Sequence, residues 1–449
     1  MTAPTGDHQI TELGDGLRVV TESLPGVHSA SIGVWIPVGS RDEQADQRGF
    51  AHLVEHMLFK GNERWDAVGI SSFFDGIGSD ANAATTKEYT VVHSRVLTRH
   101  LPATLDIFGE MILAPAFGAE DLNSEREVVL EEFAMYEDSP SDVAHELADS
   151  LVFDPHPLGQ PIIGTLETVR GASPETMRGF HARHYATGGL VISAAGNIEH
   201  AAVVAAVRER FLAPAATQAP RLAAARASVT APAGRARVVT KDTEQVHLCV
   251  AAPGIARSDE RRYAAALLDT IFGSTPSSRL FREIRENRGL AYSVYSWLSH
   301  YTDAGELGVY VGVRSDRVRE VLGVLVKELE RIRRSPVDAN ELERAKDHLE
   351  GRMLLSLEST TVRGNRLGSA LITGTPIDPV EETVRRLRAV SVADVQELAA
   401  ELLDPARLSL AAVAQDGNAV ERAAMDVLGV SAEALVAGDP PSSREAIAG

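Results

Sequence analysis

The two halves of this chain repeat one another, and this restricts the fold more than any other feature of the sequence. Residues 28–61 read as an apolar strand, a polar turn and a helix that begins near Arg48, and residues 245–274 follow the same order. Their apolar positions also correspond, with Phe50 matching Tyr263. The period is too long for a solenoid, so we expect duplication of a whole domain.

A segment without periodic apolar residues separates the halves. Residues 213–235 are rich in Ala, Pro and Gly and show the period of neither a strand nor a helix, as expected of a linker. On both sides of it, strand pairs alternate with long helical patterns. We therefore predict an α+β protein with two homologous domains, 1–212 and 236–438, each a mostly antiparallel sheet packed with helices. Residues 439–449 are predicted to form a disordered tail.

The composition excludes several classes of protein. The 449 residues include a single cysteine, Cys249, which rules out an intramolecular disulfide framework. No stretch approaches the ~18 consecutive apolar residues of a membrane span, and the amino-terminal segment lacks the features of a secretory signal. The formal net charge is −19 at pH 7, and there is no dense run of Lys or Arg. We expect a cytoplasmic protein that binds neither nucleic acid nor membrane.

An H-x-x-E-H sequence occupies the predicted helix of the first half, from His52 through Glu55 to His56. One helical turn separates the histidines, so both imidazoles can reach one metal ion. Glu55 lies toward the same face, where its carboxylate can take a proton from a metal-bound water. An isolated match of this kind is equally compatible with two partly buried histidines on an amphipathic helix. The second half keeps the apolar pattern but has other residues at these three positions: Ala265, Leu268 and Asp269.

A catalytic zinc site needs a third protein ligand and one open position. The segment 122–140 supplies carboxylates on a predicted helix, which Asn123 or Ser124 is expected to cap. Four of its residues are predicted to share one face: Glu125, Val128, Val129 and Glu132. Glu132, which follows the second histidine by 76 residues, is a candidate ligand, and Glu125 is placed two turns earlier to support a ligand.

Together these segments resemble the pitrilysin and mitochondrial processing peptidase family, from Leu17 to about Leu410. The resemblance rests on GFAHLVEHMLFKG, on GSDANAATTKEYT and on the helix that carries ExxxxxxE. It implies that each chain forms half of a clamshell and binds one Zn²⁺. It also implies the role of each polar residue of the site: His52, His56 and Glu132 as metal ligands, Glu55 as the catalytic base, and Glu125 as the acid that supports a ligand.

The resemblance assigns roles to five further residues. Asn82 and Ala83 match the edge strand beside the metal, to which an extended peptide adds through backbone hydrogen bonds; composition alone favours a simple turn here. Arg285 and Tyr292 match a pair that contacts the substrate and stabilises the developing oxyanion. The alternative to this role is a surface arginine and an interfacial tyrosine. Phe59 matches an apolar specificity pocket, although its counterpart in the second half favours a place in the core.

The implied activity is that of a zinc metalloendopeptidase. Family members of this length pair, so the resemblance predicts a homodimer that encloses a chamber and hydrolyses peptides or unfolded segments inside it. One alternative is a non-catalytic structural or assembly subunit, but such relatives lose the zinc ligands or the base, and this chain has all four. Another is a subunit that needs a different partner chain for activity, which the internal Arg/Tyr pair argues against.

Overall fold

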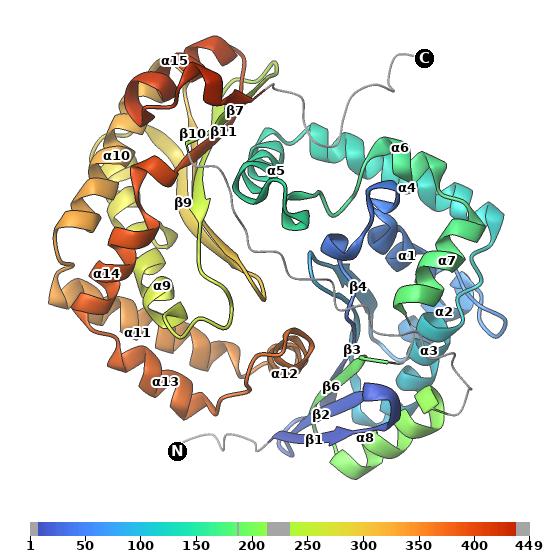
Figure 1. The fold of residues 1–449 in the computed structure, drawn as a ribbon. Coiled ribbons are helices and arrows are strands. Elements are labelled where there is room, and N and C mark those ends of the chain that lie inside the picture. The colour runs from blue at the N-terminus through green and yellow to red at the C-terminus, as the bar shows by residue number, and fades with distance from the viewer. Residues whose placement is uncertain (1–7, 186–187, 213–233, 437–449) are drawn as a thin grey trace. The chain divides into compact units, whose positions relative to one another are not determined.

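A computed structural model describes residues 8–185, 188–212 and 234–436 of the chain (Figure 1). The predicted tail 439–449 lies outside the described residues, as does the predicted linker apart from its last two positions. The described chain divides into two compact units, each built on one six-stranded sheet with helices packed on it. The first unit takes the described residues as far as Glu131, those from Pro161 to Leu212, and Leu354–Val380.

The elements of the first unit, including the helix α4 that begins in it, have the following bounds: β1 (His8–Glu12), β2 (Arg18–Ser23), β3 (Ser29–Ile36), α1 (Phe50–Leu58), α2 (Ala67–Gly76), β4 (Ala81–Thr85), β5 (Thr90–Leu97), α3 (Leu101–Leu113), α4 (Ala119–Glu137), α6 (Leu166–Gly171), α7 (Pro174–His184), β6 (Val191–Gly196), α8 (His200–Val207) and α12 (Thr360–Thr373). Those of the second unit are α5 (Pro140–Phe153), β7 (Ala236–Thr240), β8 (Val246–Pro253), α9 (Arg262–Asp269), β9 (Ala291–His300), β10 (Gly305–Val313), α10 (Val318–Arg334), α11 (Ala339–Ser356), α13 (Val380–Ala389), α14 (Val392–Leu402), β11 (Ser409–Ala414), α15 (Gly417–Leu428) and β12 (Leu435–Val436).

The two sheets share a topology, which confirms the predicted duplication. Their strand orders are β1-β2-β6-β3-β5-β4 and β12-β7-β11-β8-β10-β9. In the last five strands of each sheet, the first pair is parallel and the following pairs are antiparallel. The predicted α+β class with mostly antiparallel sheets is therefore confirmed, and β4 and β9 occupy equivalent edges.

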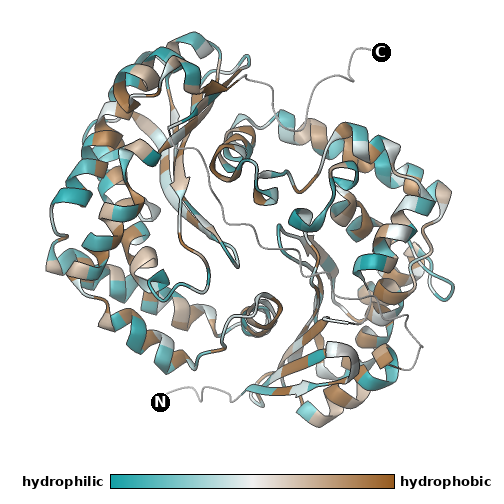
Figure 2. Cartoon of the chain, in the orientation of Figure 1, coloured by the Kyte–Doolittle hydropathy of each residue, from teal (hydrophilic) through white to brown (hydrophobic). Residues whose placement is uncertain are grey.

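Burial of apolar side chains holds each unit together. The strands are mainly hydrophobic, whereas the helices that cover them carry hydrophilic residues on their outer faces (Figure 2). In the second unit, the sheet and the helices packed on it share one large cluster of buried apolar residues. No helix in the described part of the chain is both long enough and apolar enough to cross a bilayer.

Each unit also contains one helix from the other half of the sequence. Helix α5 precedes the predicted linker but packs on β8 and β11, where Leu147 and Leu151 join the cluster that contains Cys249. Helix α12 lies far beyond the linker but packs on β3 and β6. Its Gly368 lies against Trp35 so closely that any side chain there would collide with the indole. The repeat pattern did not reveal this exchange of helices.

Candidate metal centre

Helix α1 presents the H-x-x-E-H side chains on its less buried face. Between Phe50 and Leu58, every residue is buried except His52, Glu55 and His56, which are half-buried. Apolar packing of the other residues therefore fixes the rotation of the helix and leaves these three polar side chains together.

The start of α1 is held by a carboxylate from the preceding loop. Gly49 takes a positive φ of 87° at the N-cap, a conformation that glycine adopts without steric cost. The backbone N–H groups of Gly49 and Ala51 donate to Glu43 Oε2 at 2.8 Å and Oε1 at 2.7 Å. Glu43 thus accepts from two backbone N–H groups that would otherwise lack a partner at the N-terminus of the helix, and the second of them, that of Ala51, immediately precedes His52.

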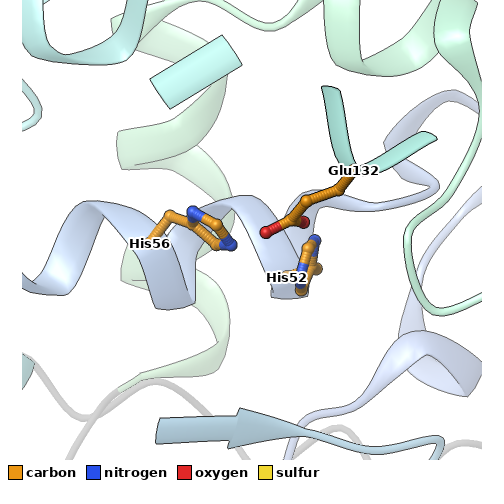
Figure 3. A group of neighbouring side chains, drawn as sticks. All are labelled: His52, His56 and Glu132. Atoms are coloured by element: carbon orange, nitrogen blue, oxygen red, sulfur yellow. The ribbon is translucent and has the colours of Figure 1, made fainter. Parts of the chain in front are cut away.

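Helix α4 brings Glu132 to the two histidines (Figure 3). The imidazole centroids of His52 and His56 are 4.7 Å apart, and the ligand atoms of all three residues lie within 4.8 Å of one another. Among the described residues, this is the group of three or more His, Cys, Asp or Glu side chains that is compact enough to hold a metal ion. The two histidines come from adjacent turns of one helix, and the carboxylate comes from a second helix.

The predicted details of α4 need two corrections. The helix begins at Ala119, so Asn123 and Ser124 lie inside it and do not cap it. Glu120 and Asp121 occupy its first turn, where acidic side chains interact favourably with the helix dipole. Val128 is 42% exposed and does not share the inward face with Glu125 and Glu132, whereas the equally apolar Val129 is fully buried.

The donor set and its protonation fit zinc. Tetrahedral Zn²⁺ with ligand bonds of ~2.0–2.2 Å separates its ligand atoms by roughly 3.4 Å, so small side-chain movements would close the observed spacing. Burial, followed by the proximity of His56, lowers the pKa of His52 to about 4. His52 is therefore neutral at pH 7, and a neutral imidazole is the form that binds metal.

Two charged residues extend the site beyond the ligands. Glu125 is 5% exposed. Its Oε2 lies 3.1 Å from His56 Nδ1, and its Oε1 lies 2.5 Å from Lys60 Nζ. Donation from Nδ1–H to a carboxylate leaves Nε2 with its lone pair for a metal. The predicted supporting role of Glu125 stays a prediction, and this contact agrees with it. Lys60, which lies two residues beyond the end of α1, was not predicted.

The edge strand β4 contacts Glu55. Thr85 Oγ1 donates a hydrogen bond of 2.5 Å to Glu55 Oε2. Along β4 the residues alternate between half-buried and exposed, and Thr85 shares the half-buried face with Ala83. Asn82 is on the exposed face, and its Oδ1 accepts from the backbone N–H of Ala83 at 2.8 Å. The sequence predicts a substrate-binding role for Asn82 and Ala83 of this strand, and Thr85 is a further residue that it does not single out.

The remaining predicted residues lie as follows. Phe59 is half-buried at the C-terminus of α1, whereas its counterpart Phe272 is fully buried. In the second half, the Arg285 guanidinium stacks 4.5 Å from the ring centroid of Tyr292, which is 75% exposed, and 4.8 Å from that of Phe281. Arg285 and Tyr292 are thus brought together, as a shared role requires.

Comparison with known proteins agrees with the fold and the site. Residues 18–166 match the model of the family described as insulinase (peptidase family M16), and residues 171–349 match the peptidase M16 inactive domain. The chain is 41% identical over 410 residues to an uncharacterized zinc protease of Streptomyces coelicolor, with 89% of each chain covered. It is 36% identical over 406 residues to an uncharacterized zinc protease of Bacillus subtilis, which covers 90% of this chain and 97% of the relative.

Two solved structures share the fold. A protease from Helicobacter pylori superposes with a TM-score of 0.84 at 20% identity, covering 91% of this chain and 99% of that one. A peptidase M16 inactive domain from Pseudomonas fluorescens gives a TM-score of 0.84 at 23% identity and covers 91% and 98% of the two chains. The match of residues 171–349 to the inactive-domain model agrees with the absence of the polar motif from the second half. The chain therefore belongs to the M16 family of peptidases, as the resemblance of its motifs implied.

Proposed function

We propose that this protein is a zinc-dependent endopeptidase. The observation that carries the proposal is the convergence of the ligand atoms of His52, His56 and Glu132 within 4.8 Å of one another. Glu55 lies beside the two histidines on α1. Bound zinc would polarise the peptide carbonyl and activate a water molecule. Glu55 accepts the proton of that water during attack and passes it to the leaving amine. The names of the zinc protease relatives support the same activity.

The substrate binds as an added strand along β4. This strand is at the edge of its sheet, so one row of its backbone groups is available for pairing. Its side chains are small, with alanine at positions 81, 83 and 84, which lets a second backbone approach closely. In this proposal, the backbone N–H of Ala83, which now donates to the Asn82 amide oxygen, pairs with a carbonyl of the substrate. Asn82 would release this contact when a substrate binds, and Phe59 would border the adjoining side-chain pocket.

Arg285 and Tyr292 stabilise the developing oxyanion in this proposal. Their stacking limits the motion of a guanidinium and a phenol that both donate hydrogen bonds. By the family resemblance, they act on the metal centre of a second copy, so that a homodimer encloses the substrate. Sedimentation of the purified chain tests this assembly, and a monomer with full peptidase activity would contradict it.

The activity is tested by Glu55→Gln, measured as zinc content and as cleavage of an internally quenched unstructured peptide. The variant is expected to bind one zinc ion per chain and to lose turnover by about 10²–10⁴-fold, because it lacks the general base. Glu127→Gln is the matched control, because Glu127 is an exposed glutamate of α4. A chelator should abolish wild-type cleavage, and added zinc should restore it. Wild-type turnover by Glu55→Gln would refute the proposed function.

A further inference from the structure

The catalytic base of the proposed reaction is hydrogen-bonded to the strand along which the substrate is proposed to bind. Thr85 Oγ1 donates to Glu55 Oε2 at 2.5 Å, and Thr85 is the last residue of the edge strand β4. Ala83, where the peptide backbone is expected to pair, precedes Thr85 by two residues on the same face of the strand. The register of β4 therefore sets the positions of both the substrate backbone and the hydroxyl that touches the base.

The single hydroxyl proton of Thr85 goes to Glu55. Within the described part of the chain, the other hydrogen-bond contact of Thr85 Oγ1 is Thr90 Oγ1, at 3.4 Å. Thr90 is fully buried and donates its own proton to the carbonyl oxygen of Val38 at 3.0 Å. Thr90 thus offers only a distant, neutral acceptor, whereas Glu55 offers a carboxylate at a much shorter distance, and hydrogen bonds to ionised acceptors are the stronger ones.

We propose that Thr85 is a positioning residue that fixes the plane of the Glu55 carboxylate relative to a peptide paired with β4. The proposal rests on the proposed function, because it needs Glu55 to act as the base. A glutamate side chain has several rotatable bonds, and the terminal one has a broad rotational preference. A hydrogen bond to one carboxylate oxygen restricts that rotation. Proton transfer needs the base within hydrogen-bond reach of the attacking water, so loss of the restriction lowers the turnover number.

The second half contains a similar contact between strand and helix that has no catalytic group. Ser296 on the edge strand β9 donates to Asp269 Oδ1 on α9 at 2.5 Å. Asp269 corresponds to His56, and the second half lacks the metal-binding motif. The contact between Ser296 and Asp269 joins strand to helix without any catalytic group. It therefore provides a matched control for the contact between Thr85 and Glu55.

The test compares Thr85→Val, Thr85→Ser and Ser296→Ala in the full-length chain, with zinc content, melting temperature, kcat and KM measured for each. Thr85→Val keeps the β-branched shape and the backbone of β4, so we expect one zinc per chain and a KM within about twofold of wild type. Its kcat should fall about tenfold, because a small misplacement of a reacting group slows the reaction by this order of magnitude. Thr85→Ser retains the hydroxyl and should stay within about threefold of wild type. Ser296→Ala should lower the melting temperature and leave kcat unchanged.

Three results would overturn the role of Thr85. They are a wild-type kcat for Thr85→Val, an equal loss of kcat in Thr85→Ser, and an equal loss in Ser296→Ala. Glu55→Gln, measured alongside, separates the two proposals. If Glu55→Gln is inactive while Thr85→Val is fully active, only the positioning role fails. If Glu55→Gln is as active as wild type, the proposed function fails and the role of Thr85 fails with it.

Discussion

At the residue scale, the site combines contacts between residues that are close in the sequence with contacts between residues that are distant in it. His52 and His56 converge because they are one helical turn apart, which the sequence alone determines. Lys60 lies beyond the end of α1, so helical spacing does not predict its contact with Glu125. Thr85 was not predictable either, because its contact with Glu55 requires a strand and a helix to meet with a defined register. The meeting of Glu132 with the histidines is equally tertiary, and only the family resemblance made it predictable.

Glu125→Gln should weaken zinc binding. Glutamine keeps an oxygen that can accept from His56 Nδ1, but it is uncharged, and its amide group cannot accept a hydrogen bond from Lys60. Removal of a partner that orients a histidine ligand typically costs 10–100-fold in affinity, and we expect about tenfold here. Competition with a chromophoric chelator measures this directly. Glu120→Gln, in the first turn of α4, is the control, and equal zinc affinities for the two variants would contradict the role of Glu125.

At the scale of elements, α1 shows how a functional helix is held at its start. The three motif residues lie on its less buried face, and Glu43 binds backbone groups at its first turn. The position of α1 was predicted to within two residues, because an apolar helical pattern follows a polar turn. The contact with Glu43 was not predicted, because it depends on how the loop after β3 folds back.

The stability of this helix start should depend on pH. Burial raises the pKa of Glu43 to about 8 from the 4.5 of an exposed glutamate, and burial raises that of the neighbouring Asp42 to about 6. Because the folded-state pKa of Glu43 is above the unfolded one, its contribution to stability is complete below pH 4.5. That contribution is lost progressively as the pH rises to about 8. Each pKa unit corresponds to about 1.4 kcal/mol, so the expected loss is on the order of a few kcal/mol.

Glu43→Gln tests this expectation, since glutamine is neutral at every pH and resembles the protonated acid. Melting temperatures of the metal-free protein measured from pH 5 to pH 8 should fall less steeply for Glu43→Gln than for wild type. Glu88→Gln, which changes another carboxylate of the same region that is paired with Arg41, is the comparison. Parallel curves for wild type and Glu43→Gln would show that Glu43 does not carry the dependence.

At the scale of the whole molecule, the repeat predicted two similar domains but not the exchange of α5 and α12. Amphipathic patterns show that a helix has an apolar face, and burial of apolar surface is non-directional. Such a pattern therefore does not state which sheet the helix will cover. The exchange depends on specific fits, such as that of Gly368 against Trp35, and these appear only in the folded chain.

A buried ion pair fastens α12 to the first sheet and provides the test of this exchange. Arg363 of α12 is 8% exposed and donates from Nη1 to Glu22 Oε1 on β2, and its Nε donates to the carbonyl oxygen of Leu357. Glu22 is 3% exposed, and its Oε2 has no hydrogen-bond partner among the described residues, so its charge depends on Arg363. Removal of one member of a buried pair leaves an uncompensated charge and typically costs about 3–5 kcal/mol.

Arg363→Met should therefore lower the free energy of unfolding by about 3–5 kcal/mol, measured by urea denaturation of the full-length chain. The added change Glu22→Gln removes the stranded charge, so the double variant should recover a large part of this loss even though it contains two substitutions instead of one. If Arg363→Met exposed only a general packing defect, Glu22→Gln would make the double variant less stable still. Recovery in the double variant would show that the buried charge of Glu22 is stabilised by Arg363 of α12. The second half of the sequence would then be needed to complete the unit that carries the metal-binding helix.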